Sequence, residues 1–267
     1  MSELDVLVPT RDRPTELAVT LSGLAAQEFA GFSVIVSDQS DGAPGWETPS
    51  ATAMIRMLER NGHPVRLSRN LPRRGLAHQR GHLLSLSSAR YVLYLDDDVW
   101  LEPGALARMH SAITELECAF VGNAVQGLSY LDDHRPHELA PYEEWQGRPE
   151  PEHVSPGSPA WGRWTLHNAA NPTHLSDRVA HRPKWTSYKI AWVGGCVLYD
   201  REMLESVGGF DFWQELPETH CGEDVLPQLR LQAKYGGAGI LPTGAVHLES
   251  PTTVPDRTSQ AYEVVSP

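Results

Sequence analysis

Apolar runs of strand length alternate with helical patterns along the first half of the chain. Residues 4–8 and 32–36 are short apolar runs, and Leu17, Leu21 and Leu24 recur between them at helical spacing. The alternation continues with apolar runs at 65–67, 91–95 and 119–125 and with helical patterns at 51–60, 83–86 and from 103. Strands that alternate with helices predict an α/β fold with a mostly parallel, doubly wound sheet and helices on both faces.

The pattern changes in the second half. Residues 129–187 lose their periodicity and are rich in proline, histidine, tryptophan and charged residues, which predicts a long loop-rich insertion. Its tryptophans favour an ordered segment, because disordered segments are poor in aromatic residues. Regular structure returns with a strand, a glycine break and a second strand at 190–199, a helix at 201–207 and another after 224. We expect a last edge strand at 240–248 and a polar tail from 250.

Three consecutive carboxylates, Asp96, Asp97 and Asp98, follow the apolar run at 91–95. They fall at the carboxyl edge of a predicted buried strand, where open α/β sheets bind ligands. Neighbouring carboxylates repel one another unless a cation or a hydrogen-bonding ligand neutralises them. Oxygen ligands favour Mg²⁺ or Mn²⁺, so the first hypothesis is a metal-bound diphosphate. The alternative is a solvated acidic turn.

Composition narrows the range of partners. The chain has 267 residues and a formal net charge of −12, which argues against binding a nucleic-acid backbone. Three separated cysteines, no secretory signal and no apolar run of about 18 residues predict a cytoplasmic protein without a transmembrane segment. Peripheral contact with a membrane stays open.

Two further polar segments lie next to predicted helices. The stretch 69–80 is basic in an acidic protein and leads into a helix, a position that suits a phosphate group. Glu223 and Asp224 come directly before the helix that follows them. Acids at a helix start also stabilise the helix dipole, so a purely structural role for this pair stays open.

These motifs together resemble those of family 2 glycosyltransferases of the GT-A fold. The resemblance covers about residues 4 to 248, and each motif alone is weak. The motifs, in order, are Val8-Pro9-Thr10-Arg11, Val36-Ser37-Asp38, Gly75 with Arg80, Asp96-Asp97-Asp98, Gly208-Gly209-Phe210-Asp211 and Gly222-Glu223-Asp224.

The resemblance implies a nucleotide-sugar site in the first half of the chain. Pro9, Thr10 and Arg11 are similar to a loop that lines the nucleoside, and Asp38 to the acid that contacts the base. Gly75 and Arg80 lie near the donor, although Gly81 stands where an asparagine is usual. The acid triplet resembles a DxD motif, in which Asp96 and Asp97 lie near the ribose and the donor and Asp98 binds Mn²⁺ or Mg²⁺. Asp96 and His247 are further candidate metal ligands.

The same resemblance implies chemistry in the second half. Asp224 is similar to the family's catalytic base, and Glu223 lies beside it. Gly194 and Gly195 would let the backbone approach the sugar. The histidines of the insertion, among them His167, receive no assignment.

The activity implied is metal-dependent, inverting transfer of a sugar from a nucleoside-diphosphate sugar, with UDP as the usual nucleotide, to an acceptor hydroxyl. The acceptor can be a sugar, a small natural product or a lipid head group. We expect a single domain over 1–267, with a nucleotide-binding half (1–125), an acceptor-binding half (126–250) that carries the insertion, and a tail (251–267).

Three alternatives stay open. A non-catalytic nucleotide-sugar binding module would keep the fold without the chemistry, but the presence of both acid clusters argues against it. A DxD phosphohydrolase places its acidic strand near the N-terminus, whereas here that strand comes fourth. A sugar nucleotidyltransferase shares the sheet but needs a glycine-rich first loop, which is missing after Val8.

Overall fold

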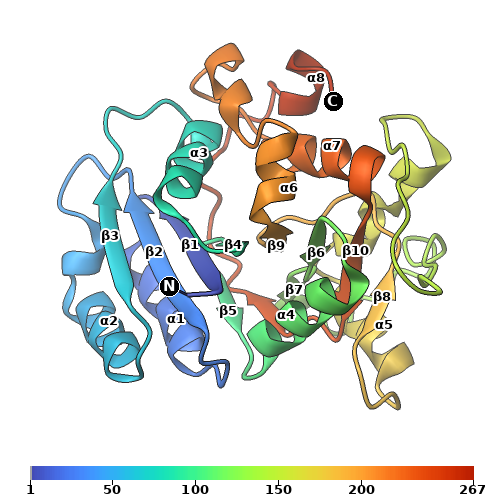
Figure 1. Cartoon of the computed structure of the whole chain (residues 1–267), viewed down its shortest axis with the longest axis horizontal. Coiled ribbons are helices and arrows are strands. Elements are labelled where there is room, and N and C mark those ends of the chain that lie inside the picture. The colour runs from blue at the N-terminus through green and yellow to red at the C-terminus, as the bar shows by residue number, and fades with distance from the viewer. Residues whose placement is uncertain (1) are drawn as a thin grey trace.

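A mixed eight-stranded sheet forms the centre of the protein in the computed structural model, which describes residues 2–267 (Figure 1). Only β9 and β8 run against the direction of the other strands in this sheet. The prediction of a mostly parallel sheet is therefore confirmed. In spatial order the strands are β3 (Val65–Arg69), β2 (Phe32–Asp38), β1 (Leu4–Thr10), β4 (Tyr91–Leu95), β9 (Cys196–Asp200), β6 (Phe120–Gly122), β10 (Gly237–Leu241) and β8 (Thr186–Tyr188).

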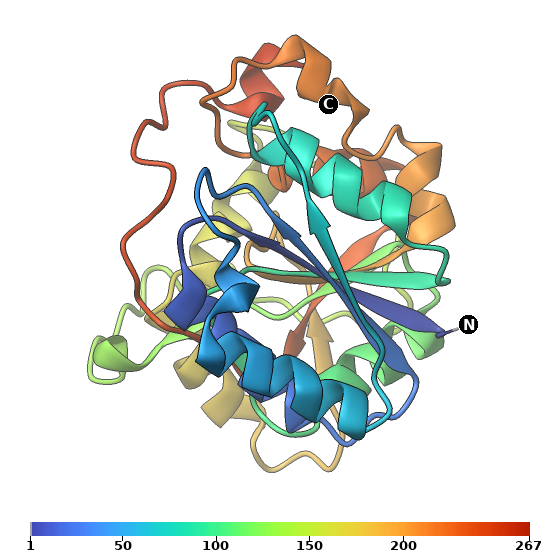
Figure 2. The same cartoon turned by 90° about the vertical axis from the view of Figure 1, so that its left-hand side faces the viewer.

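Helices cover both faces of the sheet (Figures 1 and 2). Successive side chains of a strand point to opposite faces, so Val6 and Val8 lie in one apolar core and Leu7 in the other. The first core includes α1 (Pro14–Ala25), α2 (Pro49–Arg60) and α4 (Ala105–Leu116). The second includes α3 (Leu76–Leu86), α5 (Asn171–Val179), α6 (Arg201–Ser206) and α7 (Val225–Tyr235). Burial on both faces explains why the central strands are continuous apolar runs.

A small second sheet carries part of the candidate site. It contains β5 (Val99–Leu101), β11 (Ala245–His247) and β7 (Gln126–Gly127), with β11 in the middle. The prediction of one edge strand at 240–248 is wrong, because residues 237–241 pair inside the large sheet and residues 245–247 inside the small one. The register pairs His247 with Val99 and so brings this histidine next to the acid triplet.

The insertion contains more regular structure than its sequence pattern indicates. Its short 3₁₀ helices are η2 (Leu128–Tyr130) and η3 (Pro159–His167), and α5 and β8 follow them. Elsewhere in the described residues, 3₁₀ helices form at η1 (Gly45–Glu47) and η4 (Asp211–Glu215). Residues 190–193, predicted as a strand before the glycine break, form none, whereas the second predicted strand is β9, which begins directly after the glycine pair.

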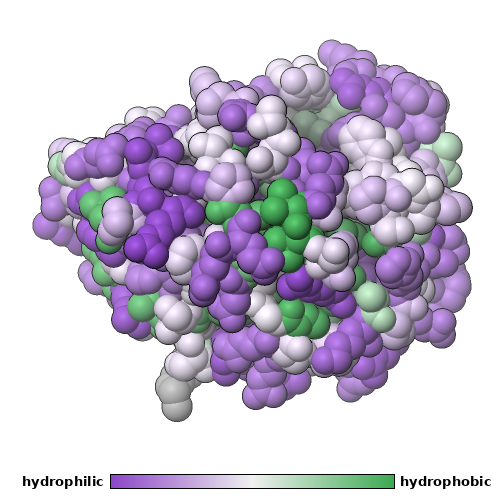
Figure 3. Space-filling view, turned by 90° about the horizontal axis from the view of Figure 1, so that it is seen from above, coloured by the Kyte–Doolittle hydropathy of each residue, from purple (hydrophilic) through white to green (hydrophobic). Residues whose placement is uncertain are grey.

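The segment predicted as a tail folds back onto the protein. Residues 249–260, which we call the strap, run along the edge at which β1 and β2 end (red in Figure 2). A β-bridge between Cys221 and Gln260 fixes the end of the strap, and α8 (Ala261–Val264) follows it. The face seen in Figure 3 is mainly hydrophilic, with some hydrophobic side chains near its centre. None of the helices described for residues 2–267 has the length and apolar content to cross a membrane.

Candidate functional site

A cavity of about 970 Å³ opens where β1 and β4 end and α7 begins. Every site residue predicted from the sequence lies on its wall except Asp38. The wall thus includes Pro9, Thr10, Arg11, Gly75, Arg80, Asp96, Asp97, Asp98, Gly194, Gly195, Glu223, Asp224 and His247. The fold therefore brings together motifs that are spread from one end of the sequence to the other.

Asp38 lies behind the cavity wall. It is fully buried, and its carboxylate accepts hydrogen bonds from the backbone amides of Ser40 and Gly45. The acid therefore fixes the loop after β2. Its neighbour Gln39 lines the cavity, and the buried side-chain amide nitrogen Nε2 of Gln39 has no hydrogen-bond partner among the described residues. A side-chain amide can pair with the edge of a base, so Gln39 offers the polar contact that the sequence motif assigned to Asp38.

Asp97 is the internal member of the acid triplet. Its carboxylate accepts hydrogen bonds from Thr10 Oγ1 at 2.7 Å and from Arg13 Nη1 at 3.1 Å. Burial and the nearby Asp98 raise the pKa of Asp97 to about 7, although Thr10 and Arg13 lower it. The triplet is thus tied to the loop after β1, and Arg13 takes part in it although no sequence motif singled it out.

Asp98 lies on the side of the triplet that faces the small sheet. Its Oδ2 accepts a hydrogen bond from Arg13 Nη1 at 2.6 Å and lies 3.6 Å from His247 Nε2. Burial and Asp96 raise the pKa of Asp98, while His247 and Arg13 act in the opposite direction. In this structure Arg13 is thus the nearest cation to the Asp98 carboxylate.

The side chains of Asp98 and His247 fit a divalent metal in donor type and separation. Two ligands that each lie about 2.0–2.2 Å from one ion can be 3.6 Å apart, and one carboxylate with one imidazole suits Mn²⁺. A metal that binds a diphosphate takes few ligands from the protein, because phosphate oxygens and water supply the others. Residues 2–267 contain no group of three or more acidic, histidine or cysteine side chains arranged to hold a metal. Asp96, the further candidate ligand, accepts a hydrogen bond from Arg80 through its Oδ1.

Arg80 joins the two acid clusters. The guanidinium, which is almost fully buried, donates to Asp96 Oδ1 at 3.0 Å and to Glu223 Oε1 at 2.9 Å. It also lies over the ring of Tyr94. Burial lowers the pKa of Arg80, but Asp96 and Glu223 raise it by more. Arg80 therefore neutralises carboxylates of the protein itself, and this contact fixes the distance between the acid triplet and the start of α7.

Asp224 places its carboxylate at the start of α7 and on the cavity wall. It occupies the N-cap position but makes no capping hydrogen bond with its side chain. Gln228 donates to the carbonyl of Val193 and accepts from its amide, which fixes the segment next to Gly194 against α7. A Cβ on Gly194 would lie 3.1 Å from Asp224 Oδ2, which is a tight contact, so the glycine leaves room for the carboxylate. Burial and the adjacent Glu223 raise the pKa of Asp224 to about 7.

Gly75 makes room for a histidine that belongs to the second acid segment. Gly75 has φ +90, and a Cβ on it would lie 2.3 Å from the imidazole of His220. His220 Nε2 accepts a hydrogen bond from the amide of Ala77 at 3.0 Å and thereby caps the start of α3. Arg73, in the basic stretch before this helix, lines the cavity with a buried Nη1 that has no partner among the described residues. Arg73 is therefore a better candidate than Arg80 for a contact to the donor.

Aromatic residues form the cavity wall beside Asp224. The ring of Trp192 lies over His167, with 4.0 Å between the ring centroids, and Tyr262 also lines the cavity. Trp192 Cζ3 and Asp224 Oδ2 flank the same glycine, at 3.9 and 3.1 Å from the point where a Cβ on Gly194 would lie. Burial lowers the pKa of His167 to about 4, so this wall is neutral near pH 7. Of these three residues, His167 belongs to the predicted insertion, whereas Trp192 and Tyr262 lie outside it.

A sequence comparison identifies the family. The profile described as "Glycosyl transferase family 2" matches residues 5–168, which is more than half of the chain. The chain belongs to glycosyl transferase family 2. This family 2 glycosyltransferase has no match among the curated proteins compared with it.

Solved structures with the same fold are glycosyltransferases of the GT-A type. S. aureus TarS matches with a TM-score of 0.56 and 17% identity over 94% of this chain and 37% of its own. TarS 1–349 in complex with UDP-GlcNAc matches with a TM-score of 0.57 and 17% identity over 95% of this chain and 60% of its own. The mannosyltransferase PcManGT from Pyrobaculum calidifontis, in complex with GDP-Man and Mn²⁺, matches with a TM-score of 0.58 and 17% identity over 94% of this chain and 58% of its own. The family 2 chain described here thus spans 37 to 60% of the length of these relatives.

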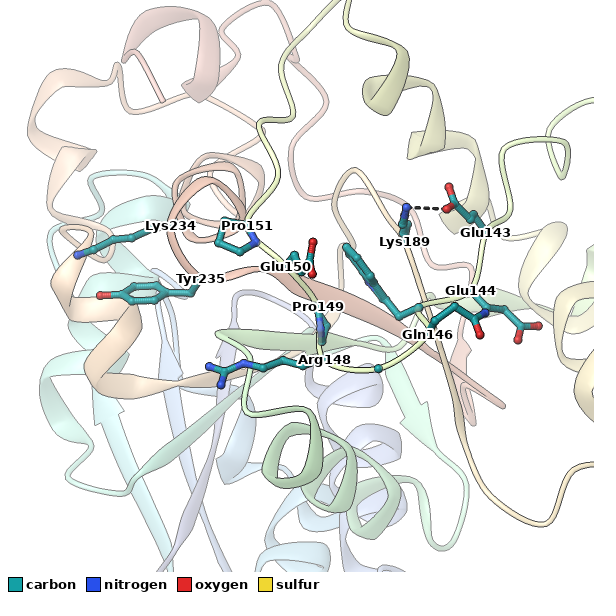
Figure 4. A pocket seen from close by; sticks show the side chains of 12 residues that line it. Glu143, Glu144, Gln146, Arg148, Pro149, Glu150, Pro151, Lys189, Lys234 and Tyr235 are labelled. Atoms are coloured by element: carbon teal, nitrogen blue, oxygen red, sulfur yellow. Dashed lines mark hydrogen bonds and ion pairs between the residues drawn. The ribbon is translucent and has the colours of Figure 1, made fainter.

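A second cavity of about 650 Å³ lies at the other end of α7 (Figure 4). Its wall includes Trp145, Lys189, Lys234 and Tyr235. The Lys189 ammonium pairs with Glu143 and lies over the Trp145 ring, so the side chains that would attract a ligand already contact each other. The acid triplet and the Glu223–Asp224 pair both line the first cavity, which is therefore the candidate active site.

Proposed function

We propose that this glycosyltransferase moves a sugar from a nucleoside-diphosphate sugar, with UDP as the nucleotide, to an acceptor hydroxyl by a metal-dependent, inverting reaction. The observation that carries the proposal is the placement of two carboxylates in one cavity. Asp98 lies beside His247, and Asp224, which makes no capping hydrogen bond with its side chain, lies at the start of α7. The Asp98–His247 pair suits a metal that binds the departing diphosphate, and Asp224 suits a base that acts on the attacking hydroxyl.

Different residues of the cavity would act on the leaving diphosphate and on the acceptor hydroxyl. Asp98 and His247 would hold a divalent cation, which supplies charge neutralisation to the departing diphosphate. Gln39 and Arg73 offer polar contacts to the nucleotide. Asp224 would take the proton from the acceptor hydroxyl as that oxygen attacks the sugar. A single displacement helped by one base inverts the configuration at the reacting carbon, and groups that meet developing charge stabilise the transition state.

The donor is tested by calorimetric titration of UDP, GDP and dTDP, each with Mn²⁺ and then with a chelator. We expect UDP to bind most tightly and its affinity to fall when the metal is removed. Replacing Asp98 with Ala removes a charge-assisted contact and should weaken Mn²⁺-dependent binding of UDP by at least about tenfold. Asp177→Asn, an exposed change on α5, removes the same charge and serves as the control.

Three results would count against this assignment. Equal UDP affinity with and without Mn²⁺ would exclude a metal-bound diphosphate. Full metal-dependent UDP binding in the Asp98→Ala variant would show that residues other than Asp98 bind the metal. If tight donor binding occurred without transfer or hydrolysis, the non-catalytic binding module would replace the enzyme as the best description.

The pH dependence of the reaction follows from the raised pKa of Asp224. A general base must be ionised, and burial beside Glu223 raises the pKa of Asp224 to about 7. We therefore expect kcat/KM to fall about tenfold for each pH unit below about 7 and to level off above it. Asp97 has a similarly raised pKa. Nucleotide affinity is therefore measured over the same pH range, to distinguish weaker nucleotide binding from protonation of Asp224. A kcat/KM that stays constant between about pH 5.5 and 7 would contradict the assignment of Asp224 as the base.

The acceptor side of the site is proposed from its position next to the base. Trp192, His167 and Tyr262 form an aromatic, neutral wall beside Asp224. Aromatic rings of this kind pack against the apolar faces of sugar rings, which favours a glycoside as the acceptor over a phosphate-rich head group. These positions support a division into a nucleotide-binding half (1–125) and an acceptor-binding half (126–250), and residues 252–257, Gln260 and Tyr262 also line the cavity.

A further inference from the structure

Arg13 lies where the acid triplet meets the strap. Its Nη1 donates to Asp97 Oδ1 at 3.1 Å and to Asp98 Oδ2 at 2.6 Å, and its Nη2 donates to the carbonyl of Pro251. The guanidinium side chain is 11% exposed, and each of the two carboxylate side chains is 8% exposed. One buried cation thus neutralises two buried carboxylates and holds the beginning of the strap against them.

Arg13 contacts the oxygen that the metal would use. Asp98 Oδ2 is the atom nearest to His247 Nε2, and it is also the atom that accepts the short hydrogen bond from Arg13. A carboxylate oxygen that pairs with a guanidinium is a poor metal ligand, because two cations then compete for the same charge. Metal binding through this Oδ2 therefore requires Arg13 to move.

The strap also engages the second candidate ligand. His247 Nδ1 accepts a hydrogen bond from the amide of Glu249 at 2.9 Å. A neutral imidazole whose Nδ1 accepts must carry its proton on Nε2, and a protonated nitrogen has no lone pair for a metal. Use of His247 as a ligand therefore requires the contact with the Glu249 amide to break. Both candidate ligand atoms therefore depend on contacts with residues 249–251. Asp98 Oδ2 pairs with Arg13, which also binds Pro251, and the proton on His247 Nε2 follows from the contact of Nδ1 with Glu249.

We propose that Arg13 is the resident cation of the acid triplet, that a divalent metal displaces it, and that this exchange releases the start of the strap from the cavity. The inference rests on the metal-diphosphate site of the proposed function. It assigns Arg13 as a positioning residue that links metal binding at Asp98 to the segment that borders the cavity. Only the molecules in which Arg13 has moved away from Asp98 can bind the metal, so the apparent metal affinity falls by the fraction of molecules in that state. Removing Arg13 should accordingly strengthen metal binding.

The test measures Mn²⁺ binding without nucleotide, by the electron paramagnetic resonance signal of free Mn²⁺, at about pH 8 so that protons compete little with the metal. Arg13→Gln should bind Mn²⁺ at least about tenfold more tightly than the unchanged protein, because it loses charge-assisted contacts to the carboxylates. Arg13→Lys keeps the charge but cannot bridge two carboxylates, and it should bind with intermediate affinity. Arg56→Gln, an exposed change on α2 with the same loss of charge, should bind as the unchanged protein does.

Hydrogen exchange of residues 249–257 gives a second readout that does not depend on activity. Saturating Mn²⁺ should increase exchange of this segment in the unchanged protein. In Arg13→Gln the segment should exchange faster even without metal. A thermal melt shows whether each variant is folded. If Arg13→Gln is not folded, the same measurements are made on Arg13→Lys.

Several outcomes would overturn the inference. Equal or weaker Mn²⁺ binding in Arg13→Gln would show that Arg13 does not compete with the metal. Strap exchange that Mn²⁺ leaves unchanged or slows would remove the link between the metal and the strap. In both cases Mn²⁺-dependent UDP binding by the unchanged protein would leave the proposed function intact. Absence of Mn²⁺ binding in all variants, with and without UDP, would overturn both.

Discussion

Replacement of Asp224 with Asn should lower kcat for sugar transfer by about 10²- to 10⁴-fold, the range typical of general-base catalysis. The amide keeps the size of the side chain but cannot accept the proton of the acceptor hydroxyl. Asp224 lies at the start of α7, away from the Asp98–His247 pair, so the variant should bind UDP with Mn²⁺ as tightly as the unchanged protein. Transfer is measured with a radiolabelled donor, and binding by calorimetry.

The same variant checks the source of the pH dependence. Its residual activity should lack the fall below about pH 7, since the group responsible for that fall is gone. Asp177→Asn on α5 provides the matched charge change at an exposed position. Full transfer activity in Asp224→Asn would exclude this residue as the base, and a parallel loss of nucleotide binding would point to a structural defect.

Replacement of Arg80 with Met should lower the free energy of unfolding by about 3–5 kcal/mol, because it leaves Asp96 and Glu223 buried or half-buried without their shared cation. Methionine approximates the length of the lost side chain, so most of the effect comes from the unpaired charges. Denaturant unfolding followed by fluorescence measures the change.

A second substitution separates charge from packing. Glu223→Gln in the Arg80→Met background removes one uncompensated carboxylate and should restore about 0.5–3 kcal/mol of the lost stability. If Arg80→Met cost less than about 1 kcal/mol, the buried pairs would contribute little and Arg80 would be free to contact the donor. Both variants should lose transfer activity, because Arg80 fixes the position of the segment that contains Asp224.

Sequence reasoning located the parts of the site that follow regular elements. The apolar run at 91–95 is β4, and the triplet follows it at the predicted edge of the sheet. The short motif at 222–224 likewise comes directly before α7. In each case local periodicity determines where the chain leaves the sheet or enters a helix, so the positions of these acids could be predicted from nearby residues.

The partners of these acids could not be predicted in the same way. Arg13 and Arg80 contact acids that are 84 and 143 positions away in the sequence, and no local pattern encodes such pairs. Asp38 occupies the expected position but is turned inward by two backbone amides of its own loop. The strap has no periodicity, and its place on the cavity wall depends on the bridge between Cys221 and Gln260. Long-range contacts of irregular segments are the part of the fold that sequence patterns do not encode.

The order of the charged residues along the chain matters while the protein is being made. Arg13 and Arg80, which neutralise the triplet, both precede it in the sequence. Ribosomes add about 5–20 residues per second, so on the order of ten seconds pass between synthesis of Asp98 and of Pro251. During that interval the nascent chain already carries the two cations that its acids need. The amino-terminal half can therefore begin to pack around its acid triplet before the segment that will border the cavity has left the ribosome.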